Sequence, residues 1–248
     1  MYHRCVNAPE GSIEQCLALA IGQVNDGHPE RAKQLCEQAM AAYPPHPAIL
    51  QLLAVLCLKD GQVVRAGQCI AASLALRPDH APSLLVAGDV ARAAGDPRAA
   101  LVHHTRAQVL LPGRADASYT LGLTLRDCGR MAEAEQALSR SVALVPAHAE
   151  AWFALALIRQ DRRDLEGAAQ ALRQLLLVAP PRAEVEVNLG IVLQEAGHMD
   201  EAMGAYGRAY RLHEDSFGRI AHALAAPGCG RLWLNLDELR DCLRTAPA

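Results

Sequence analysis

The chain has 248 residues, of which 51% are hydrophobic and only 4% aromatic. Most of the apolar residues are Ala and Leu, which favour helices, whereas a β-sandwich or β-barrel needs more β-branched and aromatic residues. This apolar content, together with 21% charged residues, also excludes a wholly disordered chain. The composition therefore predicts an all-α protein.

The charge pattern bears on the kind of partner. The formal net charge is −3, and the sequence contains neither a basic block for nucleic acid nor a polybasic run for an anionic membrane. No stretch approaches the ~20 apolar residues of a membrane span. The first residues lack the apolar segment of a signal peptide, and the eight cysteines contain no CxxC pair. We therefore expect a cytoplasmic protein with free thiols that neither binds nucleic acid nor inserts into membranes.

The main feature of the sequence is a repeat of 34 residues. An alanine recurs at this interval without insertion, as Ala32, Ala66, Ala100, Ala134, Ala168 and Ala202. A proline follows the first five of these alanines by twelve residues, as Pro44, Pro78, Pro112, Pro146 and Pro180. A glycine precedes five of them by five residues, as Gly27, Gly61, Gly95, Gly129 and Gly197. A period of this length is typical of a helical solenoid.

This register divides the chain into an N-terminal lead (1–12), six repeats and a C-terminal cap with an apolar terminal segment (217–248). The repeats are 13–46, 47–80, 81–114, 115–148, 149–182 and 183–216. Each repeat predicts two helices. The glycine at position fifteen ends the first helix in a left-handed conformation, and the proline at position thirty-two stops the second. Small residues at positions eight and twenty let the helices approach closely.

The fifth repeat resembles the tetratricopeptide repeat (TPR) family most clearly. Trp152, Leu155, Ala168, Leu172 and Pro180 stand at the W, L, A, F and P positions of the family pattern. The resemblance covers residues 13–216 and implies antiparallel helix pairs stacked into a right-handed superhelix. The sixth repeat departs from the pattern because Glu214 takes the place of the last proline, so its second helix is free to run on.

The segment after the repeats has its own signals. Residues 216–226 predict a capping helix, since terminal repeats need a modified outer face. Asn235 followed by Glu238 is typical of a capping box and predicts a short helix that ends near Arg244. Residues 232–244 are strongly apolar and must be buried. The sequence leaves open whether this segment fills a groove of the repeats or docks elsewhere.

No catalytic or metal-binding set emerges from the sequence. Five of the ten histidines follow the repeat: His46, His80 and His148 share its last position, and His28 and His198 share position sixteen. His104 falls on a packing position that Ile70, Leu138 and Leu172 fill elsewhere, and Cys16, Cys36 and Cys57 likewise replace apolar packing residues. The known nucleotide-binding and hydrolase motifs do not occur. We therefore expect no enzymatic activity, no cofactor and no metal.

The resemblance also implies a binding site. In TPR proteins the first helix of each pair lines a concave groove, largely through positions two, five, nine, twelve and thirteen. The groove residues implied here are Leu17, Ile21, Gln51, Val55, Leu85, Asp89, Arg92, Tyr119, Leu123, Arg126, Phe153, Leu157, Gln160, Val187, Ile191 and Gln194. Of the twelve residues at positions five and nine, ten are apolar. The Lys, Asn and Arg set with which some family members clamp chaperone tails is missing, which excludes that role.

An apolar groove of this length usually marks an interaction site. The sequence therefore predicts a non-catalytic scaffold that binds an apolar peptide or helix of a protein partner. Two alternatives stay open. The chain could self-associate into a homo-oligomeric assembly, or it could be the accessory subunit of an enzyme, such as a glycosyltransferase, carried on another chain.

Overall fold

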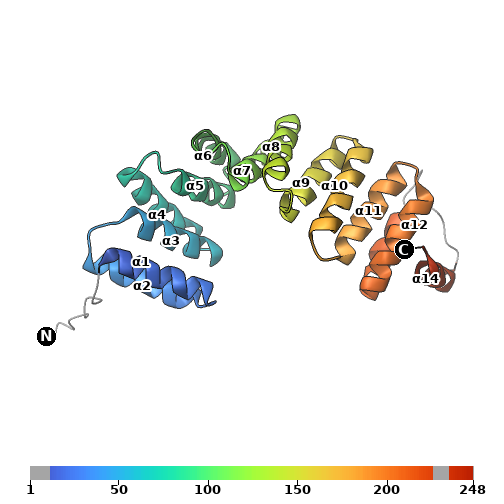
Figure 1. The fold of residues 1–248 in the computed structure, drawn as a ribbon, viewed down its shortest axis with the longest axis horizontal. Coiled ribbons are helices and arrows are strands. Elements are labelled where there is room, and N and C mark those ends of the chain that lie inside the picture. Colours follow the sequence, from blue (N-terminus) through green and yellow to red (C-terminus); the bar gives the residue numbers. More distant parts are fainter. Residues whose placement is uncertain (1–11, 226–234, 248) are drawn as a thin grey trace. The chain divides into compact units, whose positions relative to one another are not determined.

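The computed structural model describes residues 12–225 and 235–247, and these residues form fourteen α-helices and one short 3₁₀ helix, with no strand (Figure 1). The expected all-α fold is thus confirmed. The chain divides into two compact units, 1–128 and 129–248, so the boundary lies inside the fourth predicted repeat.

Each unit contains a run of helices. The first contains α1 (Ile13–Asn25), α2 (Pro29–Ala42), α3 (Pro47–Lys59), α4 (Val63–Leu76), α5 (Ala81–Ala93), α6 (Pro97–Leu110) and α7 (Ala115–Asp127). The second contains α8 (Met131–Leu144), α9 (Ala149–Asp161), α10 (Leu165–Val178), α11 (Ala183–Glu195), α12 (Met199–Leu212), α13 (Phe217–Leu224) and α14 (Leu236–Thr245). Each helix from α1 to α12 begins at position one or seventeen of the 34-residue frame.

Local capping signals fix where many of these helices begin. At α1, Ser12 and Gln15 form a capping box in which each side chain bonds the other's backbone amide. At α6 and α10, the carboxylates of Asp96 and Asp164 accept hydrogen bonds from backbone amides of the first turn. These pairings satisfy amide groups that have no partner inside the helix.

The ends of the first helices confirm the role of the recurrent glycine. All five glycines at position fifteen have φ between 74° and 87°. After α1, the amide of His28 donates to the carbonyl of Gln23 at 2.8 Å, which is the bond of a Schellman motif. The fifth repeat has Arg163 at this position, and it adopts the same left-handed conformation with φ 64°.

The second helix of the sixth repeat does not run on. Helix α12 ends at Leu212, position thirty of its repeat as in the others, although Glu214 replaces the proline. A 3₁₀ turn (Glu214–Ser216) and α13 follow. The ring of Phe217, at the start of α13, lies 6.0 Å from the ring of Tyr210 in α12. The sixth repeat thus has an aromatic contact across this turn, where the first five repeats have a proline.

Helix packing follows the repeat inside each unit. Every recurrent alanine at position twenty is fully buried. The second helix of one repeat packs on the first helix of the next, as α2 on α3, α4 on α5, α6 on α7, α8 on α9 and α10 on α11. Because these positions carry small side chains, the helices come close enough to bury the larger apolar residues around them.

In two repeats, a glycine on the first helix lies against a ring on the second helix. A Cβ atom added at Gly88 would collide with the ring of His104, and one added at Gly190 would collide with the ring of Tyr206. Both glycines occupy position eight and both rings occupy position twenty-four. The ring thus fills the space that the missing Cβ leaves.

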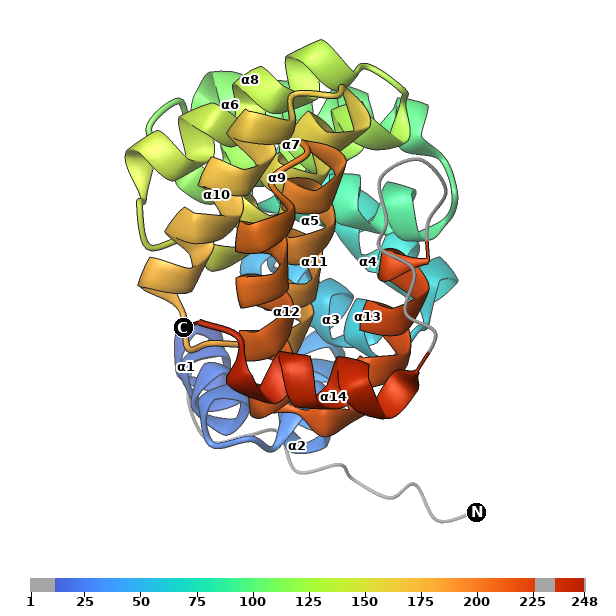
Figure 2. The ribbon, with the colours of Figure 1, turned by 90° about the vertical axis from the view of Figure 1, so that its right-hand side faces the viewer.

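The C-terminal helix docks on the sixth repeat. Figures 1 and 2 show α14 beside α12, and its residues Leu239 and Leu243 are buried. Nη1 of Arg211 donates to the carbonyls of Leu243, Arg244 and Ala246 at 3.0–3.3 Å. At Gly207 a Cβ would stand 2.8 Å from the Leu243 carbonyl oxygen, so α12 needs a glycine there.

The described part of the terminal segment, 235–247, therefore docks on α12, the second helix of the sixth repeat. Asn235 caps α14 as predicted, although its side chain accepts from the amide of Asp237, and the helix ends at Thr245. Residues 232–234 of the predicted segment lie outside the described residues.

Candidate functional site

The predicted groove residues lie on the first helices of the repeats. In the first unit α3 contacts α5 directly, and α5 contacts α7. Positions five and nine are one helical turn apart, so both fall on the same face of each helix. We call the residues at these positions in α1, α3, α5 and α7 the first-unit face. We call Phe153, Leu157 and Ile191, at these positions in α9 and α11, the second-unit face.

The first-unit face is partly open. One residue, Ile21, is 44% exposed. The other residues of this face are half-buried: Leu17, Gln51, Val55, Leu85, Asp89, Tyr119 and Leu123. The second-unit face is also half-buried, as are the predicted polar residues Arg92, Arg126 and Gln160. Side chains with this exposure contribute to packing and still present surface to a partner.

Two of the predicted groove residues are covered, which corrects the prediction for α11. Val187 is fully buried, and Gln194 is only 3% exposed. The side-chain amide of Gln194 donates to the carbonyl of Ala223 at 2.8 Å and accepts from the hydroxyl of Tyr206 at 2.9 Å. Helix α13 packs on α11. Gln194 therefore holds the C-terminal cap, and neither buried side chain is available to a partner.

The predicted polar residues link neighbouring repeats. Nε of Arg92 pairs with the carboxylate of Asp127 at 2.9 Å, and Nε2 of Gln160 donates to Glu195 at 3.4 Å. Both contacts join position twelve of one repeat to position thirteen of the next. The guanidinium group of Arg163 also reaches the Glu195 carboxylate, at 3.1 Å. These side chains are already engaged, so a bound peptide would have to compete for them.

Asp89 sits above a buried histidine. His104 is fully buried, which confirms its predicted packing position. Its Nδ1 lies 2.7 Å from Thr124 Oγ1, and its Nε2 lies 3.1 Å from the Leu85 carbonyl oxygen. The carboxylate of Asp89 stands 3.6 Å from Nε2. The ring therefore ties α6 to both α5 and α7 beneath the first-unit face.

The cysteines pack as predicted. Cys16, Cys36 and Cys57 are buried. Burial raises the pKa of the Cys36 thiol to about 12, and it also raises the pKa of Cys57. A thiol that stays protonated is a poor nucleophile.

Within residues 12–225 and 235–247 there is no group of three or more His, Cys, Asp or Glu side chains that could hold a metal ion. In the same residues, no helix combines the length and apolar character needed to cross a membrane.

Solved structures of low sequence identity share this fold. PilW, titled a widely conserved type IV pilus biogenesis factor, is 16% identical with a TM-score of 0.77, over 86% of this chain and 98% of that chain. The pilF protein of Pseudomonas aeruginosa is 20% identical with a TM-score of 0.71, over 82% of this chain and 92% of that one. YrrB, titled a TPR protein with an unusual peptide-binding site, is 17% identical with a TM-score of 0.54, over 68% and 87%. At these identities the likeness concerns the fold alone.

The sequence also matches models of a protein family. A search of the curated proteins found no match. Two family models described as tetratricopeptide repeat match the chain, one over 24–87 and the other over 79–149, 119–184 and 153–219. Members of this family are typically non-catalytic, and their repeats are generally protein–protein interaction modules. With matches over most of its length and helix pairs in a 34-residue register, the chain belongs to the tetratricopeptide repeat family.

Proposed function

We propose that this protein is a scaffold that binds an apolar peptide or an amphipathic helix of a protein partner along its first helices. The observation that carries the proposal is the first-unit face, where six of the eight residues are apolar and none is fully buried. Apolar side chains gathered on one accessible face usually mark an interaction site. The apolar side chains of an amphipathic helix, spaced three or four residues apart, match such a surface.

The second unit carries a smaller apolar surface of its own. Phe153 and Leu157 are half-buried on α9, and Ile191 is half-buried on α11. At α11 the cap takes over, because α13 packs on this helix and Val187 and Gln194 are buried there. We therefore place the C-terminal limit of this second surface at α11.

The central test removes the two aromatic residues. We expect Tyr119→Ala combined with Phe153→Ala to abolish partner binding while the helical fold persists, because aromatic anchors often contribute at least ~2 kcal/mol each. A pull-down with the wild-type chain followed by mass spectrometry identifies the partner. Titration calorimetry with the purified partner then compares affinities, and circular dichroism checks the fold.

The matched control is Val64→Ala combined with Val109→Ala. These valines are 79% and 73% exposed on second helices, so this control also removes exposed apolar surface, but away from the proposed face. The control should bind the partner like the wild type. Normal binding by the Tyr119 and Phe153 variant would contradict the proposal.

Light scattering separates this function from homo-oligomeric assembly. A scaffold for another protein should be monomeric at micromolar concentration. A stable oligomer that the two aromatic substitutions dissociate would instead assign the same face to self-association. An accessory subunit would copurify with an enzyme in the pull-down.

A further inference from the structure

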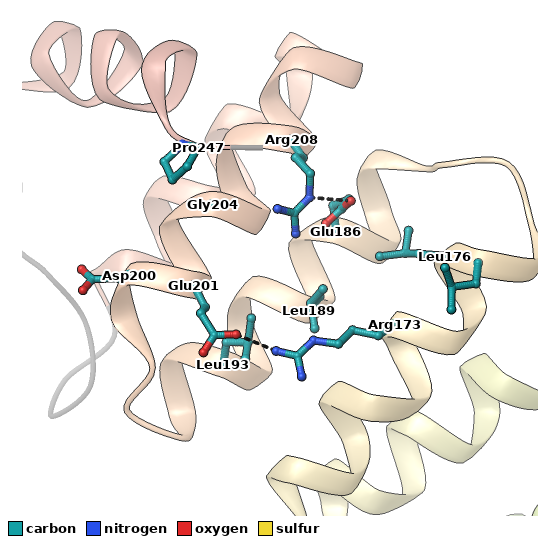
Figure 3. Close-up of a pocket in the computed structure, with 11 residues that line it drawn as sticks. Arg173, Leu176, Glu186, Leu189, Leu193, Asp200, Glu201, Gly204, Arg208 and Pro247 are labelled. Carbon is teal, nitrogen blue, oxygen red and sulfur yellow. Dashed lines mark hydrogen bonds and ion pairs between the residues drawn. The ribbon is translucent and has the colours of Figure 1, made fainter.

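The second unit has a pocket between α11 and the second helices α10 and α12 that the predicted groove does not include. The pocket has a volume of about 690 Å³ and is lined by α10, α11, α12 and Pro247 (Figure 3). On α11 it uses positions four, seven and eleven, whereas the predicted groove uses positions five, nine and twelve. At 3.6 residues per turn, the centres of these two sets differ by about 130° around the helix. The pocket and the proposed face thus lie on different sides of α11.

The unusual residue of the pocket is Glu186. It occupies position four, where the other repeats have Cys16, Leu50, Leu84, Ser118 and Trp152. Glu186 is only 5% exposed. One carboxylate oxygen accepts from Nε of Arg208 at 2.9 Å, but the other, Oε2, is buried with no hydrogen-bond partner. A buried carboxylate oxygen is costly to leave unpaired, so this atom points to a missing donor.

The rest of the pocket indicates what carries that donor. Its walls include Leu189 and Leu193, which are buried, and Leu177, which is 77% exposed. Figure 3 shows Leu189 between two ion pairs, Arg208 with Glu186 and Arg173 with Glu201. Both arginines are therefore already paired with carboxylates. The Glu186 carboxylate would repel an anionic ligand. A cationic ligand would supply the hydrogen-bond donor that Oε2 of Glu186 lacks.

We propose that this pocket binds a lysine side chain of a protein partner. The four methylene groups of lysine would pack along the leucines, and its ammonium group would donate to Oε2 of Glu186. A lysine suits the site because it combines a long apolar stem with a compact charge carrying three donors. A further carboxylate, Asp200, also lines the pocket and adds to its negative charge. The pocket thus recognises a basic residue at a place separate from the apolar surface.

The first unit provides an internal comparison. A pocket of about 560 Å³ on α2, α3 and α4 is lined there by eight residues, seven of which occupy repeat positions that also line the second-unit pocket. Its ion pair, Arg65 with Glu37, joins the same two positions as Arg173 and Glu201 with the charges exchanged. Position four, however, is Leu50. This pocket has the shape without the buried carboxylate and should not bind lysine.

The test uses Nα-acetyl-lysine N-methylamide as the probe and nitrogen-15 NMR of the full chain as the readout. We expect saturable shifts of the amides of Glu186, Leu189 and Gly204, and none at Leu50 or Gln68 in the first-unit pocket. The norleucine analogue, which has the same stem without the ammonium group, should give no saturable shift. Absence of saturable shifts with the lysine probe, as when water alone satisfies Oε2, would overturn the proposal.

Two variants test the residues. Glu186→Gln should lower the affinity for the lysine probe at least tenfold. Leu177→Ser removes an exposed wall residue, leaves both ion pairs in place, and should also weaken binding. Its matched control is Val109→Ser, at the same repeat position in the first unit and also exposed, which should bind the probe normally. Unchanged affinity in both Glu186→Gln and Leu177→Ser would refute the site. Neither result depends on the Tyr119 and Phe153 test of the apolar face.

Discussion

At the residue scale, position fifteen shows what a single backbone angle requires. Five repeats place glycine there, and all five have positive φ. The fifth repeat places Arg163 in the same conformation, with φ 64°. A side chain in this region brings Cβ close to the following carbonyl oxygen, at a cost of about 1–2 kcal/mol. The repeat tolerates the cost because the surrounding helix pair determines the turn.

We expect Arg163→Gly to raise the free energy of unfolding by about 0.5–1 kcal/mol, because glycine adopts this conformation without strain. The Arg163 side chain is largely exposed, so the loss of its ion pair with Glu195 should matter little. Urea denaturation measures the change. Arg163→Ala is the control, since it removes the ion pair and keeps the strain. The expectation fails if the glycine variant is no more stable than the alanine variant.

The cysteines make a second prediction at this scale. Iodoacetamide at pH 8 should label the half-buried Cys128 and Cys242 of the folded protein before Cys36, whose thiol has a pKa of about 12. Because that folded-state pKa lies above the unfolded value, the thiol favours folding at neutral pH, and this stabilisation is lost as the pH rises through 9 toward 12. Peptide mass spectrometry measures the order of labelling. Early labelling of Cys36 in the folded protein would contradict its burial.

At the element scale, pairs of positions adjust the distance between helices. Positions eight and twenty-four carry Ala156 and Leu172 in the fifth repeat but Gly190 and Tyr206 in the sixth. The Tyr206 ring occupies the place of a Cβ on Gly190, and its hydroxyl donates to Gln194. One position therefore restricts the residue type allowed at the other.

A double-mutant cycle tests this coupling. Gly190→Ala should destabilise the protein by about 1–3 kcal/mol, because the added Cβ overlaps the Tyr206 ring. In the Tyr206→Leu background, which copies the fifth repeat, the same substitution should have a smaller effect. Chemical denaturation of the four proteins gives the coupling free energy. Equal effects of Gly190→Ala in both backgrounds would show that the two positions are independent.

At the scale of the whole molecule, the two ends of the array differ. Position seven is buried in α3, α9 and α11, but Leu19 at this position in α1 is 61% exposed. At the other end, α13 packs on α11 and α14 packs on α12. The C-terminal helices thus cover apolar surface that a further repeat would otherwise cover.

The cap should contribute measurably to stability. We expect Leu243→Ala to cost about 2–4 kcal/mol, because this side chain is fully buried against the sixth repeat. Leu236→Ala, on the same helix but 52% exposed, should change stability by no more than about 0.5 kcal/mol. Calorimetric melting of both variants makes the comparison. Partner binding at the apolar face should survive in both, and its loss in Leu243→Ala at temperatures where the chain is folded would implicate the cap in binding.

The sequence by itself determined the repeat period, the helix pairs and the buried alanines. These features depend on local signals that recur in register: a small residue at position twenty, a glycine that ends the first helix, and a proline near the end of the second. Each acts within a few residues of its own position, so the 34-residue frame alone is enough to place it. His104 could also be assigned to packing, because its column in the frame is otherwise apolar.

Only the tertiary structure decided which face residues stay accessible and where the C-terminal helix docks. Val187 and Gln194 fit the groove pattern, but both are buried in α11, and α13, which packs on α11, lies outside the repeats. Comparison of position four across the six repeats reveals the charge of Glu186. The pairing of Glu186 with Arg208, and the absence of a partner for its second oxygen, follow from contacts between helices. A repeat pattern specifies what each position is within its own unit. It does not specify which distant segment comes to lie on that position, because such contacts depend on how the whole chain packs.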